Sequence, residues 1–316
     1  MIIKPLKKTA PLLQLEALKH RLPADHPAYP GLMTAYHKRH AGHRGEQSLN
    51  FIFNRFFSEF RIFQDIRLPV SPDRFFQLDA ILLTPHRLFL LEVKHLKGSI
   101  DIPSRYGLMT RTLPETVEQF TNPLVQLHNT SELLWVWAAE RGLPELPVHH
   151  IAVFTHRDSV LWRPADCLLL RPEELWRVTK ELTAADPETT GKEKALQSWQ
   201  SALLASHKPA PLPKLSSWQL TLQNLRPGVR CGTCSDFTMH WLHKRWRCTR
   251  CGRIELYAHR AALEDFFNLT SDPFTNGEVR DFLQLNSRHT TRRFLQDVGC
   301  RQLTKPHSHL YIPPGC

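Results

Sequence analysis

Two apolar segments, residues 75–84 and 88–93, contain charged side chains where a strand meant only to pack would not place them. Both segments are rich in aliphatic and aromatic residues, which favour strands. The turn signal Pro85-His86 lies between them, so an antiparallel hairpin is predicted. Because proline does not favour the turns preferred in two-residue loops, a longer loop with a shifted register is the alternative.

A two-residue loop determines which side chains face each other. Asp79 then lies opposite Glu92, with both carboxylates on one face, and Gln77 lies opposite Lys94 on that face. Two carboxylates about 5 Å apart repel by roughly 3 kcal/mol at an effective dielectric constant near 20. Protonation of one acid, neutralisation by Lys94, or a bound divalent cation would offset this repulsion.

A divalent cation suits these residues chemically. Mg²⁺ uses few protein carboxylates and keeps several waters, so two acids and a substrate phosphate oxygen would hold it. Lys94 would then lie beside a metal-bound water and stabilise negative charge on a phosphate. The alternative is a solvated surface hairpin, but the neighbouring side chains are too apolar for that: Phe76, Leu78, Ile81, Leu82, Leu90, Leu91 and Val93.

An upstream helical stripe adds a third acid. Apolar residues recur at helical spacing from 49 to 60, and Glu46 lies on the same stripe. A charge at the start of a buried stripe points toward the domain interior or its edge. The alternative is ordinary placement in a first helical turn, where the helix dipole favours acids.

These motifs, taken in order, resemble the nuclease-related domain, NERD, a branch of the PD-(D/E)xK nuclease superfamily. The resemblance covers roughly residues 40–155 and rests on Gly45-Glu46, Gln77-Leu78-Asp79, Leu91-Glu92-Val93-Lys94, Gly98-Ser99-Ile100, and Asn122-Pro123 with Gln126. It implies an α/β fold with an αβββαβ core, a mixed sheet flanked by helices. It also implies that Asp79 and Glu92 bind Mg²⁺ or Mn²⁺ and that Lys94 assists the attacking water. Glu46 matches the acid of the first helix, and Gln77 matches the glutamine before the aspartate.

The length and charge of the chain indicate how many domains it can form and what kind of partner it can bind. A chain of 316 residues, 41% hydrophobic, suffices for about two domains. Its 41 Lys and Arg against 30 Asp and Glu give a net charge of +11, which suits a polyanion such as nucleic acid. No apolar run reaches the roughly 18 residues that span a bilayer. The first residues lack a secretory signal and the cysteine usage is that of a reducing compartment, so a cytoplasmic protein is expected.

Composition shifts divide the chain into five predicted segments. They are a partly helical lead-in (1–40), the nuclease-like domain (41–206), a proline-rich linker (207–224), a zinc ribbon (225–258) and a C-terminal module (259–316). Within the second segment, helices are expected at 117–141, 173–184 and 188–205, with a buried strand at 148–154.

Two C-x₂-C knuckles separated by thirteen residues form the most specific motif: Cys231, Cys234, Cys248 and Cys251. Four thiolates from two tight turns match tetrahedral Zn²⁺, and a site filled by protein leaves no position for a catalytic water. The site is therefore predicted to be structural. The alternatives are four unpaired thiols or a redox pair.

Aromatic and basic residues alternate inside the predicted ribbon, a composition that suits stacking on bases and contact with phosphates: Trp241, Lys244, Arg245, Trp246 and Arg247. At least one tryptophan is expected to form the small core that a ribbon requires. Three nearby histidines have the chemistry of zinc ligands but are expected to face solvent: His240, His243 and His259.

Near the C-terminus, Thr275 and Ser287 are predicted to cap two short helices, with Gly299 ending the second. The pair resembles a helix-turn-helix, and residues 303–312 would form a wing. Four side chains would then face DNA: Arg288, His289, Arg292 and Arg293. The alternatives are a solvated helix face, dimerisation, or docking onto the nuclease-like domain.

Together these features predict a metal-dependent nuclease that hydrolyses phosphodiester bonds in DNA, with the ribbon and C-terminal helices positioning the nucleic acid. The main alternative is a non-catalytic DNA-binding or regulatory protein that keeps the nuclease fold as a scaffold. RNA is a third candidate partner, less favoured than DNA. The sequence does not determine the oligomeric state.

Overall fold

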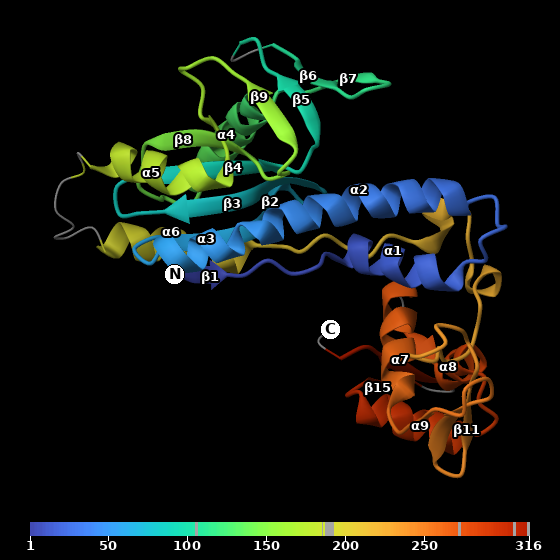
Figure 1. Cartoon of the computed structure of the whole chain (residues 1–316). Coiled ribbons are helices and arrows are strands. Elements are labelled where there is room, and N and C mark those ends of the chain that lie inside the picture. Colours follow the sequence, from blue (N-terminus) through green and yellow to red (C-terminus); the bar gives the residue numbers. More distant parts are fainter. Residues whose placement is uncertain (105–106, 185, 187–192, 271–272, 306–307, 315–316) are drawn as a thin grey trace. The chain divides into compact units, whose positions relative to one another are not determined.

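The computed structural model describes residues 1–104, 107–184, 186, 193–270, 273–305 and 308–314. Figure 1 labels the elements of two compact units, neither of which is continuous in sequence. Unit 1 contains Met1–Lys8 and Arg39–Pro209, and unit 2 contains Thr9–Lys38 and Ala210–Cys316. The first forty residues therefore contribute to both units.

A six-stranded mixed sheet forms the centre of unit 1, in the order β1-β2-β3-β4-β8-β10. Strands β2, β3 and β4 are antiparallel neighbours, whereas β1, β8 and β10 join by parallel pairing. The bounds are β1 (Ile2–Lys4), β2 (Arg61–Ser71), β3 (Arg74–Leu83), β4 (Leu88–Lys94), β8 (Val148–Phe154) and β10 (Leu169–Leu170). The α/β class is confirmed.

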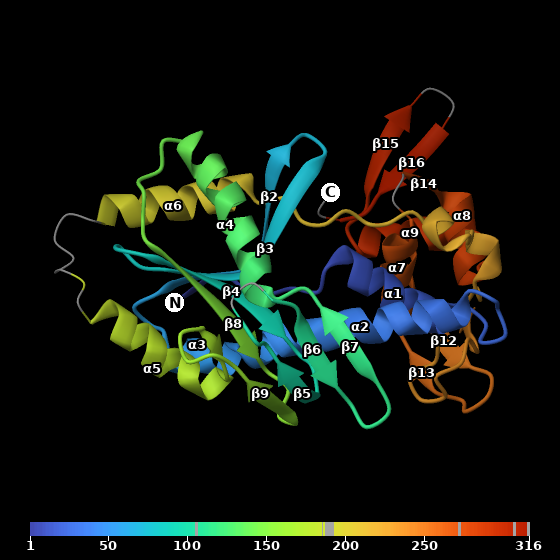
Figure 2. The same ribbon diagram turned by 90° about the horizontal axis from the view of Figure 1, so that it is seen from above.

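Helices cover both faces of this sheet. One apolar core lies between the sheet and α4 (Pro123–Ala139) with α6 (Glu193–Ser206), and Figure 2 shows α4 lying across the central strands. The other core lies between the sheet and α3 (Asn50–Phe56) with α5 (Pro172–Thr183). The order of these elements is the predicted αβββαβ core, but its first helix is divided: Glu46 lies in α2 (Tyr29–Ser48), so the expectation of one helical stripe from Glu46 through residues 49–60 is wrong. Across the described residues, none of the helices combines the length and apolar character needed to cross a membrane.

The predicted hairpin register is confirmed, since residues 80–83 pair with residues 88–91 in the order expected for a two-residue loop. The Thr84 backbone N–H donates to the Arg87 carbonyl at 3.0 Å. The Thr84 hydroxyl also accepts from the backbone N–H groups of His86 and Arg87, at 3.3 and 3.1 Å. The threonine side chain thus closes a loop whose proline does not favour a primed turn.

A second, four-stranded sheet follows directly from the carboxyl ends of β4 and β8, in the order β7-β6-β5-β9. Its strands are β5 (Gly98–Asp101), β6 (Met109–Thr112), β7 (Val117–Phe120) and β9 (Ser159–Trp162). The prediction of a helix from residue 117 is therefore wrong at its start. Helix α4 begins only after Asn122, whose side chain accepts from the Leu124 N–H at 2.9 Å.

Unit 2 shares one apolar core, which includes the fully buried Trp246. A three-stranded ribbon sheet contains β11 (Met239–Leu242), β12 (Arg245–Cys248) and β13 (Ile254–Glu255). The helices are α1 (Ala10–Arg21), α7 (Ala258–Leu269), α8 (Asn276–Leu283) and α9 (Arg288–Asp297), with two 3₁₀ turns, η1 (Leu215–Trp218) and η2 (Leu222–Asn224). Strands β14 (Phe274–Thr275), β15 (Arg301–Lys305) and β16 (Ser308–Ile312) form a further small sheet. The predicted caps Thr275 and Ser287 are confirmed.

A buried arginine explains why part of the first forty residues belongs to unit 2. Arg21, at the end of α1, has no exposed side-chain surface and donates to Asp265 of α7 at 2.8 Å. It also donates to the carbonyls of Arg226 and Gly228, at 3.1 and 3.2 Å. Because a buried charge is costly without partners, these bonds hold α1 in the core of unit 2.

Helix α2 (Tyr29–Ser48) ends against the strands that follow it in unit 1. A Cβ atom at Gly45 would lie 2.6 Å from the Cβ of His95 and 2.9 Å from the Thr155 hydroxyl oxygen, so only glycine allows this approach. We expect Gly45→Ala to destabilise the protein by about 2 kcal/mol, because the helix must move away from the sheet. Urea unfolding would measure the change.

The matched control is Gly42→Ala, three residues earlier in the same helix, where an added Cβ meets no atom within 4 Å. It should be neutral or stabilise the protein by up to about 1 kcal/mol, because alanine favours helix. Equal effects of the two substitutions would contradict a close approach at Gly45.

Candidate active site and cysteine cluster

Four acidic side chains interact near the carboxyl end of β4. They come from separate elements of unit 1: Glu46 from the last turn of α2, Asp65 from β2, Asp79 from β3 and Glu92 from β4. Burial raises the pKa of Glu46 to about 7, and repulsion from Asp65 and Glu92 adds to this effect. Burial, followed by Glu92 and Glu46, raises the pKa of Asp79 well above its ordinary value. The fold therefore concentrates negative charge here.

Asp79 ends the β3–β4 ladder. Its Oδ2 accepts a hydrogen bond from the backbone N–H of Val93 at 2.8 Å, so a side chain replaces a main-chain carbonyl as the partner of β4. Paired residues stop at Ala80 and Leu91, one rung before Asp79 and Glu92. For that reason the predicted pairing of Gln77 with Lys94 is wrong.

Lys94 bonds to one of the acids instead. Its Nζ donates to Glu92 Oε1 at 2.7 Å and to Gln126 Oε1, from the first turns of α4, at 3.2 Å. The two charged side chains keep only 22% and 9% of their surface exposed, for Lys94 and Glu92 respectively. The site thus combines two of the three outcomes expected from the sequence, a lysine counter-ion and an acid with a raised pKa.

Asp65 was missed by the sequence reasoning, although it interrupts an apolar strand just as Asp79 does. Its φ of 52° lies in the left-handed region, which an aspartate tolerates better than most residues. The backbone pairs Gln64–Ala80 and Ile66–Leu78 lie on either side of Asp65. Asp65 and Asp79 occupy the rung between these pairs but are not themselves paired, so the ladder skips that rung. A residue in the left-handed region departs from the extended backbone that a ladder rung requires, which accounts for the skipped rung.

Two side chains hold this kink in place. Lys4 of β1 donates from Nζ to the carbonyls of Gln64 and Asp65, at 2.6 and 2.8 Å. Gln77 donates from Nε2 to Asp65 Oδ1 at 2.8 Å. Gln77 therefore supports the acidic site through Asp65, and Lys4 is a second residue that sequence reasoning missed.

The acidic residues fit one side of a Mg²⁺ or Mn²⁺ site. They offer the hard oxygen ligands that these ions prefer, and burial together with neighbouring carboxylates raises the pKa values of Glu46 and Asp79. They do not form a closed cage. In the part of the chain that the structure describes, only the cysteine cluster has three or more ligand atoms all within 4.8 Å of one another. Water and substrate oxygens would complete the shell around an ion.

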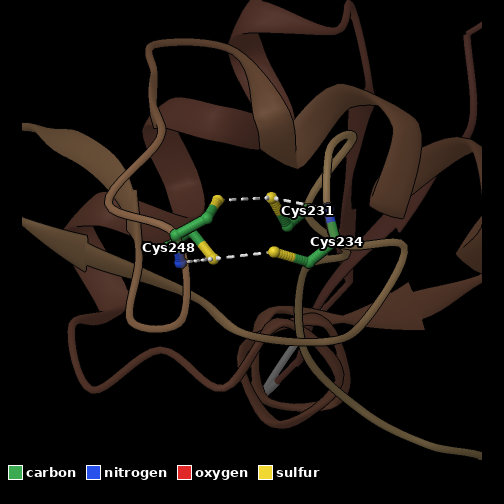
Figure 3. Close-up of side chains that lie close together, drawn as sticks. Cys231, Cys234 and Cys248 are labelled. Carbon is green, nitrogen blue, oxygen red and sulfur yellow. Dashed lines mark hydrogen bonds between the residues drawn. The ribbon is translucent and has the colours of Figure 1, made fainter.

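Figure 3 shows the cysteine side chains of the two knuckles pointing toward one another. Sulfur–sulfur distances are 3.7 Å for Cys231–Cys251 and 3.9 Å for Cys234–Cys248. A tetrahedral zinc ion with Zn–S bonds of about 2.3 Å requires sulfur separations of about 3.8 Å. The Cys251 backbone N–H donates to the Cys248 sulfur at 3.4 Å, which favours the thiolate form of Cys248. The cluster is compatible with zinc.

The basic residues predicted to contact nucleic acid lie on exposed surfaces of unit 2: Arg245 and Arg247 on β12, and Arg288, His289, Arg292 and Arg293 on α9. Trp246 is buried, which confirms that at least one ribbon tryptophan belongs to the core. The expectation that His259 faces solvent is wrong. Its ring is 2% exposed, stacks on Phe294 with centroids 3.7 Å apart, and accepts a 3.1 Å hydrogen bond from Trp246 Nε1.

The raised pKa of Glu46 predicts how stability depends on pH. Between its ordinary pKa of 4.5 and its folded value of about 7, the folded state holds a proton that the unfolded state releases. This contribution to stability is therefore present below pH 4.5 and lost as the pH rises through 7. Glu46→Gln removes this contribution. Without added divalent cations, the free energy of unfolding of the variant relative to that of the native protein should therefore rise by about 2 kcal/mol from pH 5 to pH 8.

Urea unfolding at the two pH values would measure this difference. Glu132→Gln, on the exposed side of α4, is the matched control and should keep the native pH dependence. A Glu46→Gln variant whose stability follows the native curve would contradict the crowding of negative charge around Glu46.

Comparison with known proteins gives a match that includes the residues of the candidate active site. No curated protein and no solved structure gave a significant match to the chain. One protein-family model matches, the nuclease-related domain NERD, over residues 41–155. This segment runs from the last turns of α2 through β8 and contains Glu46, Asp79, Glu92 and Lys94. The resemblance predicted from the motifs is confirmed: residues 41–155 of this chain match the nuclease-related domain.

Proposed function

We propose that this protein is a metal-dependent nuclease that hydrolyses phosphodiester bonds in DNA in the cytoplasm. One observation carries the proposal: Asp79, Glu92 and Glu46 repel one another beside Lys94, within a segment that matches the nuclease-related domain. A charge excess of this kind costs stability unless the site binds a cation. Its position among elements of the αβββαβ core supports a role in chemistry.

Each residue has a distinct proposed role. Asp79 and Glu92 would hold Mg²⁺ or Mn²⁺, and Glu46 would hold a second ion or a water. An ion bound there would lower the pKa of a coordinated water and offset charge on the phosphate. Lys94, whose ammonium is oriented by Gln126 Oε1 at 3.2 Å, positions the attacking water and stabilises the developing negative charge. Gln77 acts through Asp65, which it holds at 2.8 Å.

We further propose that unit 2 positions the nucleic acid. Cys231, Cys234, Cys248 and Cys251 would hold a structural Zn²⁺ within residues 225–258. In residues 259–316, α8 and α9 would act as a helix-turn-helix, with Arg288, Arg292 and Arg293 on phosphates, and Arg245 and Arg247 would add contacts from the ribbon. Phosphate contacts give little sequence selectivity, so we expect weak sequence preference. DNA is the favoured polymer, with RNA the competitor.

A second candidate is a DNA-binding or regulatory protein that keeps the nuclease fold without cutting. The ion pair between Lys94 and Glu92 favours it, because that 2.7 Å contact neutralises the acid without a metal. The two candidates share salt-sensitive binding of nucleic acid and differ in hydrolysis.

We expect the native protein to cut plasmid or labelled DNA when Mg²⁺ or Mn²⁺ is added. Lys94→Ala and Asp79→Asn should each slow cutting by about 100-fold or more, because they remove charge stabilisation and a metal ligand. Filter binding or anisotropy should show that both variants still bind DNA. Exposed residues supply the matched controls, Lys194→Ala on α6 and Asp73→Asn in the β2–β3 turn, and both should cut at the native rate.

Two results would count against the nuclease. If the native protein cuts no DNA or RNA with either metal, the scaffold candidate is favoured. If Lys94→Ala and Asp79→Asn cut at the native rate, the hydrolysis comes from another site or from a contaminant.

The cysteine cluster predicts about one zinc ion per purified chain, measured by mass spectrometry of the metal content. Cys248→Ser should lose most of this zinc and lower the melting temperature, because four-cysteine sites supply folding energy directly. Cys300→Ser, a half-buried cysteine of unit 2 outside the cluster, should retain the zinc. Native protein with intact thiols and no zinc would contradict the site.

A further inference from the structure

The small sheet that follows β4 and β8 has one buried face and one exposed face. Ile100 and Met109 are fully buried and belong to the core shared with α4, with Leu161 packed against it. Side chains on the opposite face alternate with these, and two large apolar ones, Val160 and Trp162, keep 55% and 61% of their surface exposed. The exposed face is thus not needed to form the core.

Trp162 is held in a fixed orientation on that face. Parallel pairing places Trp162 beside Asp101, and Val160 beside Ser99, so all four side chains lie on the same side of the sheet. The indole Nε1–H donates to the Ser99 hydroxyl at 3.1 Å, diagonally across the two strands. The ring therefore has its polar atom satisfied and its π-surface exposed. The indole ring therefore offers a flat surface on which a partner can stack.

Two connecting segments lead from the candidate active site to this sheet, and they lie side by side. One leads from Lys94 to β5 and the other from β8 to β9, with the His95 and His156 rings 4.9 Å apart. The Gly98 N–H donates to the Asp158 carbonyl at 3.1 Å, at the point where both strands begin. The two connecting segments therefore lie side by side between Lys94 and Trp162.

These connections also carry positive charge. Lys97 is exposed in the first, and Arg157 in the second keeps 92% of its side chain exposed. Asp158 lies 3.5 Å from Arg157, but such exposed pairs are weak and leave the guanidinium available to another anion. Basic side chains followed by an exposed aromatic ring are the pattern of proteins that track a single nucleic-acid strand.

We propose that the exposed face of the β7-β6-β5-β9 sheet binds unpaired nucleobases, with one base stacked on Trp162 and the preceding phosphates near Lys97 and Arg157. The inference rests on the proposed nuclease function and names its substrate class: single-stranded nucleic acid, or a duplex with a single-stranded end. A duplex has its bases stacked internally and offers no free base face to the indole. Asp101, beside Trp162, also favours a base over a phosphate at that rung, because it would repel an anion.

Binding of fluorescent 15-nucleotide oligo(dT), oligo(rU) and a 15-base-pair DNA duplex, measured by anisotropy without added divalent cations, tests this proposal. Trp162→Ala should weaken binding of the single strands about ten-fold, in line with the loss of one stacked base, and change duplex binding less than two-fold. Trp162→Phe should restore most of the affinity, because it keeps an aromatic face. Phe51→Ala, an equally exposed aromatic residue on α3, is the control and should bind as the native protein does.

The outcomes separate this inference from the proposed function. Unchanged single-strand binding by Trp162→Ala, while the native protein still cuts DNA with Mg²⁺ or Mn²⁺, overturns the base-binding face and leaves the nuclease standing. Equal losses for single strand and duplex also overturn it, because the face would then contact backbone alone. A native protein that neither binds nor cuts any nucleic acid overturns the nuclease proposal together with this one. Comparison of oligo(dT) with oligo(rU) shows which polymer supplies the base.

Discussion

Repulsion among buried carboxylates at the carboxyl end of β4 governs the chemistry of the candidate active site. Burial and mutual repulsion raise the pKa values of Glu46 and Asp79, and an ion pair with Lys94 offsets part of the charge on Glu92. A fold selected for stability alone would avoid such a cluster, because each buried charge costs free energy. A site that binds a divalent cation requires it.

The surrounding fold keeps the acids together against this repulsion. The absence of a side chain at Gly45 lets α2 approach β4 and β8, which brings Glu46 to the sheet. A left-handed residue, Asp65, interrupts β2 at the rung it shares with Asp79, and Lys4 satisfies the two carbonyls beside it. Strain and close packing of this kind are typical of functional sites, where the rest of the structure compensates for the cost.

The sequence predicted the elements whose signals are local. Two apolar segments joined by a two-residue turn determined the register of the β3–β4 hairpin, and the knuckle spacing predicted the cysteine cluster. Asp65 and Lys4 were missed because their role depends on a backbone kink and on the pairing of β1 with β2, which no local pattern shows. The apolar spacing predicts helix at Val117–Phe120, which is a strand, because this segment precedes a true helix without a break in that spacing. His259 was expected at the surface because its stacking partner, Phe294, lies far along the chain.

The most direct test of the central claim is a crystal soaked in Mn²⁺ and measured at a wavelength where manganese scatters anomalously. We expect an anomalous peak bound by Asp79 and Glu92, with the Nζ of Lys94 displaced from its 2.7 Å contact with Glu92 Oε1. Crystals of folded protein that show no peak near these two carboxylates at millimolar Mn²⁺, with the Lys94–Glu92 ion pair intact, would contradict it.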